Sequence, residues 1–245
     1  MFDIFRLKEV LVKYKENFVS KQWPNEKYKW EAVKCFQDNW DVNAPDFADM
    51  TSKYQDKENT TMKKVLMIVG SMRKKSFNRQ LAAIAAELLR GKAEVSFLEY
   101  ADIPYMNQDI EFPVPEEIAR VREEVSRADG IWIITPEYNY SYPGVLKNLL
   151  DWLSRPTRMG APRTETAIAG KKVTISGVGG KSATANVRAK LKDLLQFMQV
   201  DLMEECETGV ALDVSAFQTN VLNPSEETKA SLQKQVDAFL KFMED

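Results

Sequence analysis

The feature that most constrains this sequence is an alternation of short apolar runs with helix-like segments, which begins at Lys63 and continues to the end of the chain. A continuous apolar run such as residues 130–135 is typical of a strand that is buried on both faces of a sheet. The runs predict five strands, at residues 63–69, 93–100, 130–135, 171–177 and 200–204. Apolar residues spaced three and four apart predict helices at 76–89, 115–127, 145–153, 185–197 and 226–243.

This alternation predicts an α/β fold with a parallel sheet, because parallel neighbours must be joined by crossover helices. Five strand–helix units suit a flavodoxin-like sheet of order 2-1-3-4-5 with helices on both faces. In such a sheet the ligand binds at the carboxyl ends of the strands, near the switch point between strands 1 and 3. The loops after strands 1, 3 and 4 are therefore the candidate site.

The first 61 residues differ in composition from the rest of the chain. Residues 1–50 contain three of the five tryptophans, and their apolar spacing predicts a small helical segment. The polar stretch 51–61 is typical of a linker, so residues 62–245 form the predicted main domain. The N-terminal segment is either a cap on that domain or an interaction module, and the sequence leaves both interpretations open.

The overall composition excludes several function classes. The 34 basic and 36 acidic residues nearly balance, which does not favour nucleic acid or an anionic membrane as partner. No apolar run is long enough to span a bilayer, so a cytoplasmic protein is expected. The chain has no histidine, which removes Ser-His-Asp and Cys-His catalysis, and its two distant cysteines match no metal spacing, so no metal site is expected. Any chemistry must use other side chains or a cofactor.

The loop after the fourth strand contains Gly180-Lys181-Ser182, which looks like the end of a Walker A motif. That motif needs a glycine five residues before Gly180, where Ile175 stands, so a nucleoside triphosphate cradle is excluded. The loop after the first strand, GSMRKKSFN, suits one terminal phosphate at a helix N-terminus, although Ser76 could equally be only a helix cap. The tyrosine- and proline-rich loop after the third strand suits a flat heteroaromatic ligand, or equally a contact between subunits.

Together these motifs resemble the NADPH-dependent FMN reductase family of flavodoxin-like proteins, over roughly residues 62–245. The motifs are G-S-x-R-x-x-S-x-N, then P-E-Y-N with S-x-P-G-x-L-K-N-x-x-D-W, then G-x-G-G, in this order. The resemblance implies bound FMN, with the phosphate held by Ser71, Arg73, Ser76 and Asn78. It also implies that Pro136, Glu137, Tyr138 and Asn139 wrap the isoalloxazine edge, and that Ser176, Gly177, Gly179 and Gly180 close over the pyrimidine side.

The same resemblance implies an NAD(P)H-dependent oxidoreductase that reduces a small-molecule acceptor such as a quinone, chromate, an azo dye or free flavin. The implied cycle is ping-pong, with NADPH or NADH as hydride donor and with no catalytic side chain, because the flavin carries the chemistry. The family implies a homodimer or homotetramer. The candidate interface is the helix Pro143–Trp152, through Val145, Leu146, Leu149, Leu150 and Leu153, although an ordinary helix packed on the sheet would have a similar apolar face. The alternative is an electron carrier or flavin-binding sensor without turnover, although such carriers usually have a more hydroxyl-rich phosphate loop.

Overall fold

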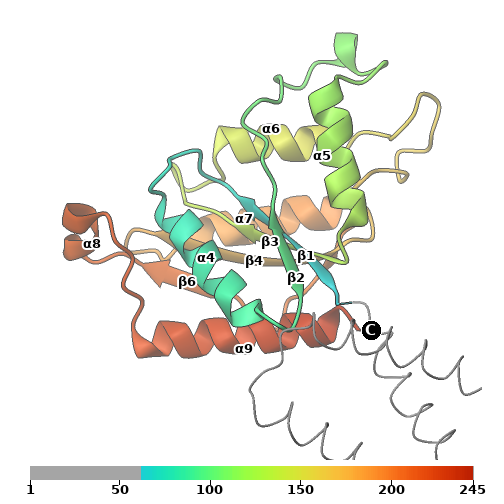
Figure 1. Ribbon diagram of the computed structural model, residues 1–245. Helices are drawn as coiled ribbons and strands as arrows, with labels where there is room; N and C mark the ends of the chain where they lie inside the picture. Colours follow the sequence, from blue (N-terminus) through green and yellow to red (C-terminus); the bar gives the residue numbers. More distant parts are fainter. Residues whose placement is uncertain (1–61, 245) are drawn as a thin grey trace, which may run out of the picture. The chain divides into compact units, whose positions relative to one another are not determined.

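The computed structural model describes residues 62–244 of the chain (Figure 1). The helical segment and the linker that we expect within residues 1–61 lie outside the described residues, so the proposed domain boundaries stay a prediction. None of the described helices is both long enough and apolar enough to cross a membrane.

The centre of the described part is a parallel sheet (Figure 1). Its strands lie in the order β2-β1-β3-β4-β5, which confirms the predicted order 2-1-3-4-5. β3 pairs with β1 along its whole length, from Gly130 opposite Val65 to Ile134 opposite Val69. The strand bounds are β1 Lys64–Val69, β2 Glu94–Phe97, β3 Gly130–Ile134, β4 Lys172–Gly179 and β5 Asp201–Leu202.

The edge beside β4 is formed by two strands, of which the sequence predicts only one. β5 pairs with the start of β4, and a further strand, β6 (Thr208–Ala211), pairs with its end from Ser176 to Gly179. Between them Glu207 forms ion pairs with two residues of the neighbouring helix, at 2.6 Å to Arg188 and 2.8 Å to Lys192. The sequence TGVA is short and contains glycine, so its strand character depends on pairing with β4 rather than on an intrinsic pattern.

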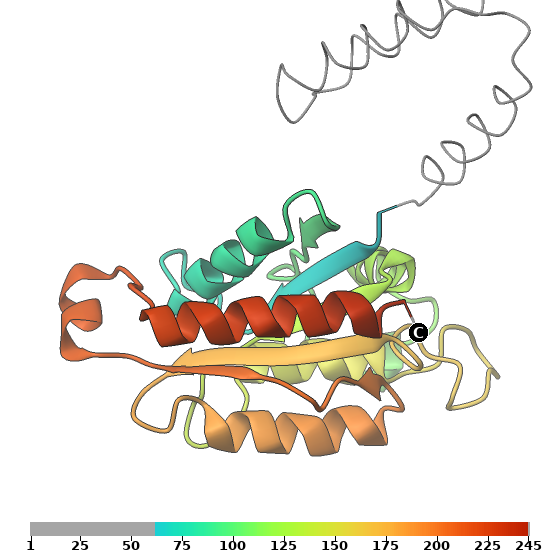
Figure 2. The ribbon, with the colours of Figure 1, turned by 90° about the horizontal axis from the view of Figure 1, so that it is seen from below.

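Two layers of helices cover the two faces of the sheet, as Figure 2 shows from below. Alternate residues of β1 point to opposite faces, so that Val65 and Met67 contact one layer, whereas Leu66 and Ile68 contact the other. The first layer consists of α4 (Phe77–Leu89) and α9 (Glu226–Phe242). The second layer consists of α5 (Glu116–Arg127), α6 (Gly144–Leu153) and α7 (Ala185–Phe197). Two short helices, η1 (Gln108–Ile110) and α8 (Val214–Thr219), lie outside these layers.

A buried polar network fixes α9 against the sheet. The Trp132 indole N–H donates to the Ser176 hydroxyl at 3.0 Å, and that hydroxyl donates to Gln235 Oε1 at 2.9 Å. The Gln235 amide in turn donates to the Thr174 hydroxyl at 2.8 Å, and all four side chains are fully buried. Because buried polar groups need partners, this chain of bonds favours one position of α9 over β3 and β4.

Candidate functional site

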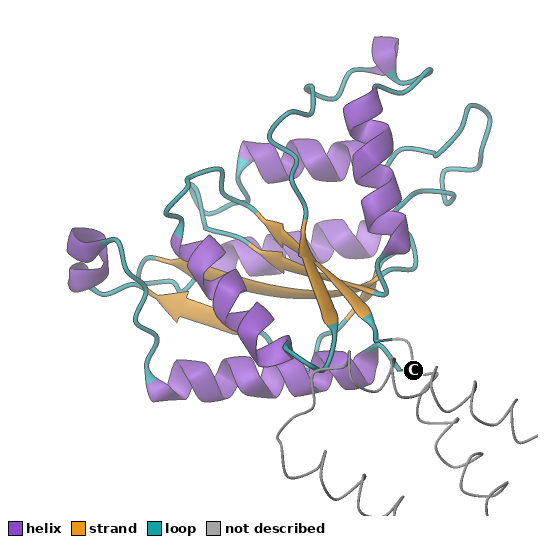
Figure 3. Ribbon diagram, viewed as in Figure 1, coloured by secondary structure: helices purple, strands orange, loops and turns teal. Residues whose placement is uncertain are grey.

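The loops after β1, β3 and β4 meet at the end of the sheet where these strands have their carboxyl ends (Figure 3). The Gly70 amide donates to Ile134 O at 2.8 Å, and the Thr135 amide donates to Ser176 O at 3.0 Å. A Cβ atom added to Gly70 would lie only 2.5 Å from the Thr135 hydroxyl, so this close approach requires glycine. The sheet thus brings together the three loops that the sequence places there.

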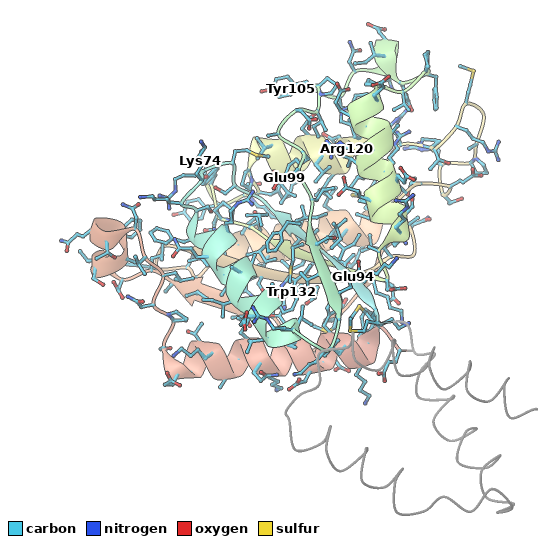
Figure 4. The ribbon with its side chains drawn as sticks, viewed as in Figure 1. Lys74, Glu94, Glu99, Tyr105, Arg120 and Trp132 are labelled. Atoms are coloured by element: carbon cyan, nitrogen blue, oxygen red, sulfur yellow. The ribbon has the colours of Figure 1, made fainter. Side chains whose placement is uncertain are left out.

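The loop after β1 combines a helix start with positive charge. Ser76 caps α4 by accepting a hydrogen bond from the Asn78 amide at 3.2 Å. Arg73, Lys74 and Lys75 are exposed, and Figure 4 labels Lys74 on this loop. The Asn78 amide is bound by Ser76, but the other amides at the start of a helix have no intrahelical acceptor, so together with these cations they form a donor set that suits an anion.

The Asn78 side chain connects this helix start to β4. Its amide donates to Val178 O at 3.0 Å, and its Oδ1 accepts from the Val178 amide at 2.8 Å. The side chain is buried, and both ends of its amide bind the backbone of a strand 100 residues away. The polar atoms of Asn78 therefore hold the loop against the sheet.

A segment that sequence reasoning missed packs on the same loop. Arg73 Nη1 donates to Asn220 Oδ1 at 2.9 Å, and its guanidinium lies 4.9 Å from the centre of the Phe77 ring. Asn220 follows α8 with a left-handed backbone (φ 56°), and its carbonyl accepts from the Gln80 side chain at 3.0 Å. Asparagine is a usual residue for such a helix end, which is the one sequence signal that could have indicated this turn.

The loop after β3 forms a tight turn that displays aromatic rings. Tyr138 and Ser141 exchange two backbone hydrogen bonds, at 2.9 and 3.0 Å, around the left-handed residues Asn139 (φ 51°) and Tyr140 (φ 59°). This pattern is a two-residue turn of type I′. Asparagine adopts this conformation readily, whereas tyrosine rarely does, and such strain occurs often at functional sites. Tyr138 is 52% exposed and Tyr140 is 70% exposed, whereas Pro136 is buried.

Glu137, in the same loop, faces the start of α7. Its Oε1 accepts hydrogen bonds from the Ser182 hydroxyl at 2.9 Å and from the Asn186 side chain at 3.0 Å. Its Oε2 accepts from the Val187 amide at 3.0 Å. Partial burial raises the pKa of this carboxyl, but the hydrogen bonds from Asn186, Val187 and Ser182 outweigh that effect and hold the pKa below its usual value.

The glycine-rich stretch begins inside β4 rather than in the loop after it. Ser176 and Gly177 lie within the predicted strand, and Gly179 is a strand residue as well, because β4 runs two residues beyond the predicted end. A Cβ atom at Gly177 would collide with the Thr135 carbonyl and with Thr184, and one at Gly179 would lie 2.8 Å from Thr184 Cγ2. An added Cβ at Gly180 would meet open space, so it is Gly180 and Lys181 that form the exposed part of this loop.

The structure corrects the interface that we expected on α6. Four of the five apolar side chains are at most 1% exposed and belong to the core between the sheet and the layer of α5, α6 and α7: Leu146, Leu149, Leu150 and Leu153. The prediction that these four side chains face another subunit is therefore wrong, since the apolar stripe of α6 is that of an ordinary helix packed on its own sheet. Val145 alone among the five is exposed, at 38%.

The sheet order and the three loops define a protein of the flavodoxin-like class. The cationic loop at the start of α4 fits a phosphate, and the rigid aromatic turn beside it fits a flat ring.

Comparison with known proteins agrees with this class. Residues 63–214 match the family model of the NADPH-dependent FMN reductases. A 2-hydroxy-1,4-benzoquinone reductase of a Burkholderia species is 34% identical over 183 residues, which cover 74% of this chain and 97% of the relative. A quinone reductase of Pseudomonas putida is 35% identical, covering 73% of this chain and 94% of the relative. The structure of FerB, a flavoenzyme NAD(P)H:(acceptor) oxidoreductase from Paracoccus denitrificans, superposes with a TM-score of 0.65 at 32% identity, covering 74% of this chain and 97% of that one.

The chain therefore belongs to the NADPH-dependent FMN reductase family. It is an enzyme of that class, with FMN as cofactor and NAD(P)H as hydride donor. The predictions of family, fold, enzyme class and cofactor from the sequence are confirmed.

Proposed function

We propose that this enzyme reduces quinones or related small acceptors with electrons from NAD(P)H, and that it binds FMN on the edge formed by the loops after β1, β3 and β4. The observation that carries the proposal is the meeting of a cationic helix start with a rigid aromatic turn at the switch point between β1 and β3. The quinone-reducing relatives support this choice of acceptor.

The proposed FMN residues have two different roles. One group is proposed to face the cofactor. Its exposed members are Arg73, Tyr138, Asn139 and Gly180, and its buried members are Ser71 and Pro136. The side chains of Ser76, Asn78, Glu137 and Ser176 hold the loops in place through the contacts described above. Gly177 and Gly179 lie where a Cβ atom would not fit, and we propose that all six residues shape the site from behind.

When bound, FMN supplies the redox chemistry, so NAD(P)H and the acceptor can react in turn at one place. The chain contributes position and charge. Arg73 and the first-turn amides of α4 bind and orient the phosphate. The tyrosines at 138 and 140 border the space in which a planar acceptor stacks, and no side chain is required to move a proton.

Two finer features of this proposal concern the whole molecule. We propose a homodimer or homotetramer, which is supported by the exposed apolar side chains of Tyr138, Tyr140 and Val145. We also propose a cytoplasmic location, as we expect from the sequence.

The experiment that tests this function is steady-state NADPH and NADH oxidation by the purified, FMN-loaded protein, with and without menadione. The proposal predicts rapid oxidation only when the quinone is present, and parallel lines in double-reciprocal plots at several quinone concentrations, as a ping-pong cycle requires. If neither donor is oxidised with any quinone, dye or free flavin, the protein is instead an electron carrier or a sensor.

A further inference from the structure

Helix α7 begins without a cap of its own. Its N-cap residue, Thr184, has a left-handed backbone (φ 63°) and makes no capping hydrogen bond with its side chain. The Thr184 hydroxyl instead donates to the carbonyl of Ala183 at 2.6 Å. The first turn of α7 also contains no acidic residue, so nothing in the helix itself offsets the positive end of its dipole.

Three other described helices carry side-chain caps of their own: Ser76 caps α4, Asp213 caps α8, and Ser225 caps α9. Helix α5 has no such cap but has Glu116 and Glu117 in its first turn. Helix α6 resembles α7, since its N-cap Pro143 makes no capping bond and its first turn has no acidic residue. What sets α7 apart is the side chain from another loop that binds its first turn.

The missing cap comes from the loop after β3. Glu137 lies 50 residues before Val187 in the sequence, and its Oε2 accepts the Val187 amide, which is the third residue of the helix and the usual donor to an N-cap. Its Oε1 accepts from the side chains of Ser182 and Asn186, so one carboxylate receives three donors from the loop after β4 and the first turn of α7. Charge-assisted bonds of this kind are stronger than neutral ones.

The hydrogen bonds of Glu137 hold the loop after β3 in a fixed position relative to the loop after β4. On one side Glu137 is followed directly by Tyr138 and Asn139 of the aromatic turn. On the other side Ser182 follows the exposed pair Gly180 and Lys181. The left-handed pair Ala183 and Thr184 (φ 47° and 63°) forms the strained bend between that loop and α7, and such bends persist only where surrounding contacts hold them.

We propose that Glu137 is a positioning residue: it caps α7 from the neighbouring loop and thereby sets the spacing of the β3 and β4 loops that hold the cofactor ring. This inference rests on the proposed function, since it is the FMN ring that the spacing serves. It also explains why the cofactor phosphate belongs at α4: the start of α7 already holds an anion, whereas the start of α4 is surrounded by Arg73, Lys74 and Lys75.

The test compares Glu137→Ala and Glu137→Gln with the control Glu116→Gln, which removes an exposed carboxylate from the first turn of a helix away from the site. The first measurement is amide hydrogen exchange of Val187 in the ligand-free protein. We expect exchange to be about tenfold faster in Glu137→Ala, because one charge-assisted bond is lost. Glutamine can keep its one acceptor oxygen on the Val187 amide but loses the negative charge, so exchange in Glu137→Gln should lie between that of the wild type and that of Glu137→Ala. The control should match the wild type.

The second measurement is FMN binding to the full chain by flavin fluorescence, followed by the visible circular dichroism of the flavin at saturating FMN. We expect Glu137→Ala to weaken FMN by about tenfold and to change the shape of the dichroism spectrum, which reports ring environment rather than protein stability. The control should change neither. Unchanged Val187 exchange would overturn the cap, and changed exchange with unchanged affinity and spectrum would overturn the positioning role.

The results for the Glu137 variants can be distinguished from a failure of the proposed function. A wild-type protein that binds no FMN would overturn that function, and with it the cofactor part of this inference. The exchange rates of the ligand-free variants would still decide whether Glu137 caps α7.

Discussion

Arg73 is the residue whose proposed role can be isolated most cleanly. Its guanidinium is exposed in the loop at the start of α4, and we propose that it binds the FMN phosphate. Riboflavin has the same ring without the phosphate. Arg73→Ala should therefore weaken FMN by about tenfold, the size of one charge-assisted contact, and leave riboflavin affinity unchanged.

Fluorescence titrations with both flavins measure this difference, with Arg127→Ala as the matched control. Arg127 is exposed at the end of α5, next to the start of β3 and so at the opposite end of the sheet from the three loops. An equal loss for FMN and riboflavin would place Arg73 at the ring or in the fold instead. If neither the FMN affinity nor the riboflavin affinity falls, Arg73 does not contact the bound flavin.

The three residues Gly179, Gly180 and Lys181 should respond very differently to substitution. A side chain at Gly179 must displace Thr184, since even a Cβ would lie 2.8 Å from its Cγ2, so Gly179→Leu should distort the loop and abolish tight FMN binding. A methyl group at Gly180 meets no protein atom, but it would enter the space that we propose for the cofactor, so Gly180→Ala should weaken FMN by about tenfold. Lys181→Ala shortens an exposed side chain and should bind FMN within about twofold of the wild type. FMN titration of the three variants checks the order, and tight binding by Gly179→Leu would contradict it.

At this scale the sequence indicates which residues gather at the site but not what each side chain does. The motif residues Asn78, Glu137 and Ser176 all lie in or beside the three loops, as predicted. Their polar atoms, however, bind Val178, α7 and Gln235, which are 100, 50 and 59 residues away. Contacts at such separations are set by how the helices pack on the sheet, and no local pattern encodes them.

At the scale of an element, Ser176 should matter for stability because it joins α9 to the sheet. Ser176→Ala leaves the buried Trp132 N–H without its acceptor and Gln235 Oε1 without its donor. The free energy of unfolding should fall by about 1–3 kcal/mol. Urea unfolding measures this, with the exposed Ser126→Ala on α5 as a control that should change stability by less than about 0.5 kcal/mol. A loss of stability in the control equal to that in Ser176→Ala would refute the role of the network.

The cap on α7 should make stability depend on pH. The pKa of Glu137 is lowered in the folded protein, so its contribution is fully present above the ordinary glutamate pKa and is lost as the pH falls through the lowered value. The stability difference between wild type and Glu137→Gln should therefore be constant near neutral pH and shrink in acid. Urea midpoints of the two proteins across this range test the sign, and a difference that grows in acid would contradict it.

Most elements are predictable because their sequence patterns are local. The predicted helix at 185–197 coincides with α7, and the predicted strand at 130–135 differs from β3 by one residue. The errors occur where pairing decides the outcome: β4 continues through Gly179 because β6 pairs with it, and β6 itself is too short to carry a pattern.

At the scale of the whole molecule, Val145 is the exposed residue of α6 that a partner subunit could contact. We expect the protein to sediment as a dimer or tetramer, and Val145→Glu to shift it toward monomer, because a charge buried in an interface is costly. Sedimentation velocity at several concentrations measures both. If Val145→Glu and the wild type sediment alike, the subunit interface does not include Val145.

The most direct test of the central claim is the absorbance of the FMN-loaded protein in rapid mixing without oxygen. After mixing with NADPH, the blue absorption of the oxidised flavin should be lost although no acceptor is present. A second mixing, with menadione, should restore it, because the two half-reactions are separate. Absorption that NADPH leaves unchanged, or that menadione fails to restore, would contradict the assignment of this chain as an FMN-dependent quinone reductase.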